Sequence, residues 1–221
     1  MHAVLRLSLL MMAAFAADAL AATQSLGIKS PNGEATIAYD MNARGQVAAV
    51  LEDDEGRQRG VLYEQGKVTE LRSLGGGYSD AKAINEQGQV VGSAQGADRR
   101  WKAFVFERGS GMRELGTLGG ASSYGLAINQ RGDVVGFSDT PDGYFHAFVV
   151  QQGRPMQDLG TLGGTISYAS AMNNTGQVVG TASMPDEYRH AFLYDPVRGM
   201  VDLGTLGGLS SSASAINDAE A

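Results

Sequence analysis

The hexapeptide LGTLGG occurs at Leu115–Gly120, Leu159–Gly164 and Leu203–Gly208, and a weaker copy, LRSLGG, occupies Leu71–Gly76. Successive copies begin 44 residues apart. A period of this length is typical of proteins that stack one supersecondary unit many times. The repeat therefore decides the class of fold, and the sequence between the hexapeptides defines the unit.

Three further markers recur in the same order in each unit. An Asn-x-x-Gly motif begins at Asn42, Asn85, Asn129 and Asn173, and a fifth asparagine is Asn217. An apolar pair follows each motif: Val47-Ala48, Val90-Val91, Val134-Val135 and Val178-Val179. The last marker is His146-Ala147-Phe148 and His190-Ala191-Phe192, with Lys102-Ala103-Phe104 and Arg59-Gly60-Val61 at equivalent positions. The chain thus holds four full copies of the unit and one clipped copy.

Each unit contains four short apolar segments between turn signals. In the third unit they are SYGLAIN, DVVGFS, HAFVV and MQDLGTL, beginning at Ser123, Asp133, His146 and Met156. All four have the length of strands, and none has that of a typical helix. Four strands in about 44 residues match one blade of a β-propeller. We predict an all-β, propeller-like array of four-stranded repeats, open or incomplete, with a β-sandwich or β-solenoid as the alternative.

The first strand of each unit, called the AIN strand here, carries small residues on one face. Ala81, Gly125 and Ala169 lie four residues before the asparagine, and an alanine usually lies two before it. Alternate residues share a strand face, so this face suits a close approach between sheets.

The number of AIN strands bears on closure of the array. The AIN strand occurs five times and each other strand four times. If a blade ends with the next AIN strand, four blades span 46–85, 89–129, 133–173 and 177–217, and the strand at 36–42 is left over. This surplus predicts either an open arc with protected edges or a fragment of a longer array, and our hypothesis is the arc.

The motifs resemble those of the HAF extracellular repeat proteins. The family pattern of LGTLGG, AIN-x-x-G-QVVG, HAF and DLG matches AINQRGDVVG from Ala127, HAF at His146 and DLGTLGG from Asp158. The resemblance covers residues 36–217, although the first repeat lacks HAF and the second has Lys102 in place of the histidine. It implies an extracellular or cell-surface location and a propeller-like fold. The family carries no assigned activity, so the resemblance implies no catalytic residues.

Each repeat carries a basic residue on its third strand and an acidic residue on its fourth. The pairs are Arg59 and Glu70, Lys102 and Glu114, His146 and Asp158, and His190 and Asp202. Because Arg and Lys offer no lone pair to a metal, this column argues against metal binding. One hypothesis is a charge-assisted hydrogen bond in each blade, and the alternative is solvated, unpaired charges.

The segment between the second and third strands varies most among the repeats. A stable scaffold with variable loops is how repeat proteins build binding surfaces. The candidate binding residues in these loops are Trp101, Asp139, Asp142, Tyr144, Phe145 and Tyr188. Aromatic faces beside acids and arginines suit a glycan or a protein ligand, and ordinary surface loops are the alternative. Calcium could use Glu52, Asp53 and Asp54, or Asp139 and Asp142, but no loop follows a known calcium pattern, so we predict no metal and no cofactor.

Composition and motifs favour a binding or structural module over an enzyme. The net charge of -7 makes nucleic acid a poor partner, and the absence of cysteine excludes disulfides and thiolate chemistry. After removal of a signal peptide only His146 and His190 would remain as histidines, and the repeat explains both. No GxSxG, HExxH or phosphate-binding loop occurs. The minority hypothesis is a propeller-type hydrolase or lyase that acts on extracellular glycans.

The N-terminus has the features of a bacterial signal peptide. Arg6 precedes the apolar run LSLLMMAAFAA, and Ala19-Leu20-Ala21 supplies a cleavage site. We predict a signal peptide at 1–21, a linker at 22–35 and an HAF-type β-repeat domain at 36–221, with repeats at about 36–77, 78–121, 122–165 and 166–209 and a partial repeat at 210–221. The protein would then be periplasmic or extracellular, without a membrane span, and open sheet edges would permit self-association.

Overall fold

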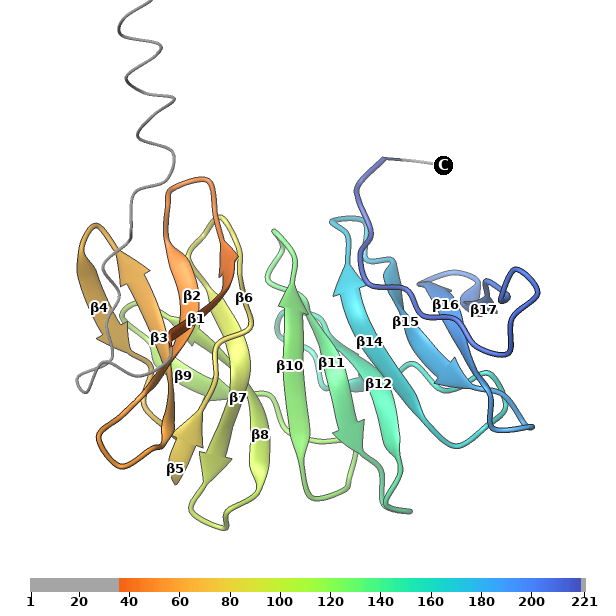
Figure 1. Ribbon diagram of the computed structural model, residues 1–221, viewed down its shortest axis with the longest axis horizontal. Coiled ribbons are helices and arrows are strands. Elements are labelled where there is room, and N and C mark those ends of the chain that lie inside the picture. The colour runs from red at the N-terminus through yellow and green to blue at the C-terminus, as the bar shows by residue number, and fades with distance from the viewer. Residues whose placement is uncertain (1–35, 220–221) are drawn as a thin grey trace, which may run out of the picture.

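The computed structural model describes residues 36–219, which form four antiparallel sheets. Figure 1 shows the sheets side by side in chain order along an arc, with the first and the fourth at opposite ends. The predicted all-β, propeller-like array is therefore confirmed, and we call the sheets the first to fourth blades. The predicted signal peptide and linker lie outside the described residues.

The blades share one plan of four strands in which each strand pairs with the next. The first blade holds β1 (Thr36–Met41), β2 (Val47–Glu52), β3 (Gln58–Glu64) and β4 (Lys67–Glu70). The second holds β5 (Gly75–Ser79), β6 (Ala83–Ile84), β7 (Val90–Gly96), β8 (Trp101–Glu107) and β9 (Gly111–Glu114), because its AIN strand is split into β5 and β6. The third holds β10 (Ser123–Ile128), β11 (Val134–Asp139), β12 (Phe145–Val150) and β13 (Gln157–Asp158). The fourth holds β14 (Ser167–Met172), β15 (Val178–Ser183), β16 (Arg189–Asp195) and β17 (Gly199–Asp202).

The AIN strand is the first strand of its blade and not the last strand of the preceding one. The blade spans 46–85, 89–129, 133–173 and 177–217 are therefore wrong. β1 pairs with β2, β10 with β11 and β14 with β15. The same strand also packs on the preceding blade, where β10 contacts β7 and β8. The copy of the AIN strand that has no blade of its own is therefore residues 211–217. It lies beside β16, where the Ser211 amide donates to the Arg189 carbonyl at 2.9 Å.

The hydrophobic core lies between the blades. Three clusters each combine residues of two neighbouring sheets, as where Val91 and Val105 of the second blade pack with Phe148 of the third. The phenylalanines of the HAF column, Phe104, Phe148 and Phe192, are fully buried. Each sheet therefore needs its neighbour to bury its apolar side chains.

The small face of the AIN strand lies against the preceding blade, as predicted. A Cβ atom on Gly125 would lie 2.7 Å from Val91 Cγ2 and 2.9 Å from the Gly92 carbonyl oxygen. Ala81 and Ala169, at equivalent positions, are fully buried. Larger side chains here would hold the sheets apart.

The repeated asparagines link the blades by hydrogen bonds. The Oδ1 atom of Asn129 accepts the Arg131 and Asp133 amides, and its Nδ2 atom donates 3.3 Å to the carbonyl oxygen of Asn173, one blade further on. The same inter-blade bond joins Asn42 to Asn85, Asn85 to Asn129 and Asn173 to Asn217. We call this series the asparagine ladder.

Buried serines form a second series of inter-blade bonds. Ser123 Oγ accepts the Ala103 amide of the preceding blade at 2.9 Å and donates to the Gly116 carbonyl at 2.6 Å. Ser167 and Ser211 bond in the same way one and two repeats later. The abundance of serine before the AIN strands therefore has a structural explanation.

The outward face of β1 is exposed in the described part of the chain. Ile37 is 48% and Met41 62% exposed. Asp40 stands two residues before Asn42, where the later repeats have alanine, and it accepts the Ile84 amide of the second blade at 2.9 Å. Asp40 thus joins two blades.

Within residues 36–219 there is no helix of the length and apolarity needed to cross a membrane.

Candidate functional site

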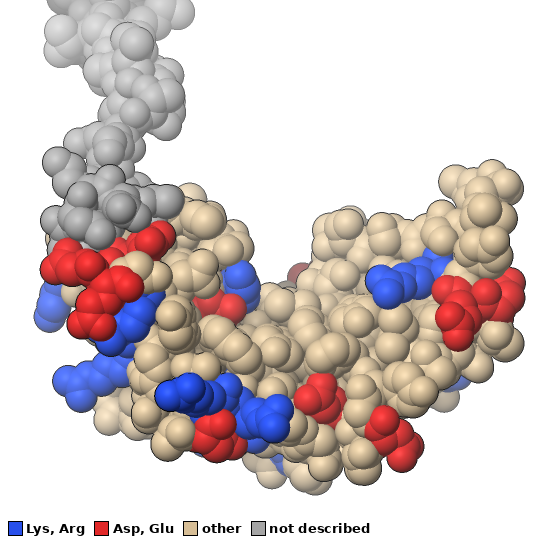
Figure 2. Space-filling view, turned by 60° about the horizontal axis from the view of Figure 1, so that its bottom comes forward, with Lys and Arg blue, Asp and Glu red and all other residues tan. Residues whose placement is uncertain are grey.

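The variable loops of the four blades lie at one end of the sheets, opposite the Asn-x-x-Gly turns. They join β2 to β3, β7 to β8, β11 to β12 and β15 to β16, and we call this end of the molecule the loop end. Figure 2 brings it forward and shows small, separate groups of charged side chains on a surface that is otherwise uncharged. Charge alone therefore does not define a site here.

Five aromatic rings gather at the loop end across the second, third and fourth blades. Tyr124 stacks on Phe137 with 4.7 Å between ring centroids, and Tyr168 meets Phe137 edge-on at 5.0 Å. Trp101 and Phe145 flank Tyr124 at 6.2 and 6.3 Å. We call these five residues the aromatic cluster.

Of the predicted binding residues, Trp101 and Phe145 belong to the aromatic cluster, and Asp139 lies opposite Phe145 in the pairing of β11 with β12. Tyr144 and Tyr188 lie on separate loops and are 47% and 43% exposed. Asp139 accepts the Ser122 amide at 3.1 Å, and Asp142 lies exposed in its loop.

Sequence reasoning missed the other members of the aromatic cluster, Tyr124, Phe137 and Tyr168. These residues lie on strands, whereas the search for binding residues was confined to loops. Tyr124 and Tyr168 interrupt the AIN strands at the same repeat position, and Asp80 takes that position in the second blade. A comparison of the repeat columns on the strands would have found them.

The acid and base columns are joined by hydrogen bonds in two blades. His146 Nδ1 lies 2.8 Å from Asp158 Oδ2, and His190 Nδ1 lies 2.9 Å from Asp202 Oδ2. In the first blade Arg59 is 3.7 Å from Glu70 but only 2.9 Å from Asp53. In the second blade Lys102 donates to the Ala121 carbonyl at 3.0 Å instead of pairing with Glu114.

A double-mutant cycle tests the His190–Asp202 contact. The Gly204 amide and His190 lower the pKa of the Asp202 carboxyl. Its contribution to stability is therefore present above the pKa of the unfolded state and lost as the pH falls through the lower, folded-state pKa. We expect the cycle of His190→Ala and Asp202→Ala to give a coupling of up to about 1 kcal/mol at neutral pH.

The matched control for this cycle is Lys102→Ala with Glu114→Ala, which should give no coupling because these side chains do not meet. Urea denaturation of each variant measures both cycles. Equal coupling in the two cycles would contradict the assignment.

The carboxylate of Asp53 is engaged by two arginines. Burial opposes its ionisation, but bonds from the Arg57 amide and from both guanidinium groups hold the pKa of Asp53 well below its usual range. Within residues 36–219 no three His, Asp or Glu side chains are grouped so as to hold a metal ion. Asp53 is thus held by protein cations at the position considered for calcium.

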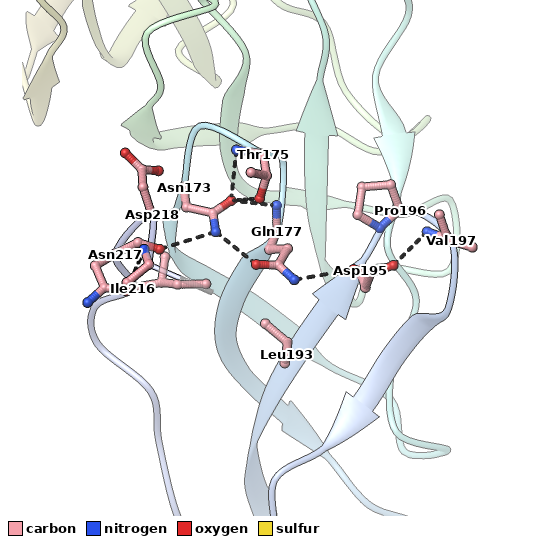
Figure 3. Close-up of a pocket in the computed structure, with 11 residues that line it drawn as sticks. Asn173, Thr175, Gln177, Leu193, Asp195, Pro196, Val197, Ile216, Asn217 and Asp218 are labelled. Atoms are coloured by element: carbon pink, nitrogen blue, oxygen red, sulfur yellow. Dashed lines mark hydrogen bonds between the residues drawn. The ribbon is translucent and has the colours of Figure 1, made fainter. Parts of the chain in front are cut away.

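A hollow of about 680 Å³ lies at the opposite end of the fourth blade, beside residues 216–219 (Figure 3). Two carboxylates line it. The Val197 amide and the Gln177 side chain lower the pKa of Asp195, and the Asn174 amide and side chain lower that of Asp218. Both groups stay ionised at neutral pH, so neither suits the role of a proton donor.

Asp80 is the described carboxyl group whose pKa is raised. Burial raises the pKa, although Lys82 lies 3.8 Å away and the Ser93 amide donates to the carboxylate at 2.6 Å. Because the Asp80 amide also donates to the Ser93 carbonyl at 2.8 Å, this residue bridges the gap between β5 and β6. The carboxylate therefore has a structural explanation within its own blade.

Comparisons with known proteins define the class of fold. No protein-family model matches the chain, and a search of curated proteins finds no match. Among solved structures the chain is similar to TolB from Acinetobacter baumannii, with a TM-score of 0.55, 12% identity, and coverage of 76% of this chain and 43% of TolB. A gluconolactonase from Xanthomonas campestris gives a TM-score of 0.47 and 11% identity, with 79% and 64% of the two chains covered.

The likeness to TolB is one of fold alone, and the fold is of the β-propeller type. The chain matches less than half of the length of TolB and less than two thirds of that of the gluconolactonase. By its fold the chain is therefore an all-β protein of the β-propeller type, built from repeats of one blade that pack face to face.

Proposed function

We propose that this chain is a secreted, non-enzymatic repeat scaffold of the HAF extracellular type that binds a glycan or protein ligand at its loop end. The blades supply the rigid support, and the variable loops supply the contacts. The signal-peptide features of residues 1–21 support a periplasmic or extracellular location.

The observation that carries this proposal is the concentration of aromatic side chains at the loop end. Tyr144 and Tyr188 are exposed on neighbouring loops, and the aromatic cluster lies in the strands beside them. Exposed tyrosines on a fixed support bind with little loss of conformational entropy, which is why they are common in binding surfaces. Two of these loops also pack on the LGTLGG turns, where Pro141 lies against Gly119 and Pro185 against Gly163.

Replacement of the exposed tyrosines should weaken binding without unfolding the chain. We expect Tyr144→Ala with Tyr188→Ala to lose about tenfold or more in affinity for ligands captured on a glycan array or by pull-down. The matched control is Tyr39→Ala, which removes an equally exposed tyrosine from the middle of β1, away from the loop end. Undiminished binding by the double variant would contradict the proposal.

The second candidate function, a hydrolase or lyase, is favoured by the raised pKa of Asp80. A carboxyl group whose pKa is raised by burial keeps its proton to a higher pH, which favours a role as a general acid. A screen with glycosidase and polysaccharide-lyase substrates decides between the two functions. Turnover by the wild-type chain that is lost in Asp80→Asn would replace the binding proposal, whereas equal inactivity of both proteins supports it.

A further inference from the structure

A second hollow, of about 440 Å³, lies at the loop end of the fourth blade. Its lining is Tyr168, Thr181, Arg189, Ser210, Ser211 and Ser212. The hollow is open to solvent over most of its extent. None of these residues is among the predicted binding residues.

The hollow exists because one repeat departs from the aromatic pattern. Between the third and fourth blades the space is filled by Phe137, Phe145 and Tyr168, whose ring centroids are 5.0 to 6.0 Å apart. The residues 44 positions further on are Thr181, Arg189 and Ser212. Two phenylalanines and a tyrosine are thus replaced by smaller or polar side chains at the same place in the next interface.

The lining combines a cation, an aromatic ring and hydroxyl groups. The Arg189 guanidinium lies 5.8 Å from the centroid of Tyr168, and its side chain is exposed. Within the described part of the chain no carboxylate lies within ion-pair distance of Arg189. Ser211 Oγ is committed to the bonds between blades, which leaves Ser210, Ser212 and Thr181 to face a ligand.

We propose that this hollow binds an acidic saccharide through its carboxylate, an inference that rests on the binding function proposed above. The Arg189 guanidinium matches a carboxylate in a two-bond geometry. The Tyr168 ring offers an apolar face to the sugar ring, and the serine hydroxyls suit its hydroxyl groups. A neutral sugar would leave the cation without a partner.

Isothermal titration with a short oligogalacturonide tests the proposal. Because the charge-assisted hydrogen bonds to the carboxylate would be lost, we expect Arg189→Ala to weaken binding by tenfold or more. Arg189→Lys should retain part of the affinity because it keeps the charge but loses the planar fork. The methyl-esterified oligosaccharide, which has a similar size but no charge, should bind the wild-type chain as weakly as the acid binds Arg189→Ala.

Arg154→Ala is the matched control, since Arg154 is an exposed arginine in the β12–β13 loop, at the end of the blades opposite the loop end. Circular dichroism and a thermal melt establish that each variant is folded. Equal affinity of Arg189→Ala and wild type, or equal affinity for acid and ester, would overturn the inference. If the chain binds other glycans or proteins but no oligogalacturonide, the inference fails and the binding function stands. If it binds nothing at the loop end, both fail.

Discussion

Phe148→Ala should lower the free energy of unfolding by about 3–5 kcal/mol. Phe148 is fully buried and packs with Val91 and Val105 of the second blade as well as with Val134 and Val150 of its own. Removal of the ring therefore leaves a cavity between two sheets rather than inside one. Since the blades are stabilised by their neighbours, the chemical unfolding curve should also become less cooperative.

The control for this variant is Tyr144→Ala, four residues earlier on an exposed loop, which should change stability by less than about 0.5 kcal/mol. Guanidinium denaturation followed by circular dichroism and by tryptophan fluorescence measures both effects. Trp101 lies in the second blade and so detects separation from the third. Equal stability of the two variants would show that the blades do not depend on this contact.

Asn129→Ala should lower the free energy of unfolding by about 2–4 kcal/mol although it removes no apolar surface. Without the side chain the Arg131 and Asp133 amides lose their acceptor, and the Asn173 carbonyl loses its donor from the neighbouring blade. Asn129 is buried, so water does not readily replace these partners.

Asn217→Ala is the matched control because Asn217 is exposed and joins the asparagine ladder through its carbonyl oxygen, which the substitution keeps. Its unfolding midpoint should stay close to that of the wild type. If Asn129→Ala and Asn217→Ala have the same unfolding midpoint, the hydrogen bonds of the asparagine ladder do not contribute to stability.

Much of the blade could be predicted from sequence because its rules are local. The alternation of apolar segments gives the strands, and Asn129 with Gly132 gives a tight turn in which Gly132 has a φ of 79° and donates to the Asn129 carbonyl at 3.1 Å. The boundary between blades could not be predicted in this way. The AIN strand pairs with the strand after it and packs on the blade before it, and the sequence does not distinguish the two kinds of neighbour.

The contacts between blades were also beyond the reach of sequence patterns. A recurrent asparagine predicts a turn, but the direction of its Nδ2 atom depends on how the next blade is placed. The same holds for Ser123, whose buried hydroxyl bonds two segments that are remote in the chain. For the acid–base columns, register places Asp202 opposite Phe192, so the His190 side chain reaches Asp202 diagonally, whereas a neighbouring carbonyl group captures the Lys102 side chain.

The asparagine ladder places the same hydrogen bond in every joint between the described blades: a side-chain amide donates to a main-chain carbonyl one repeat further on. A gene duplication of one repeat would therefore insert a blade whose two new joints already fit, and an in-frame loss of one repeat would bring together partners that also fit. Arrays of this kind can change in length by recombination while their stability per blade stays constant. Selection is then free to vary the residues at the loop end independently of the scaffold.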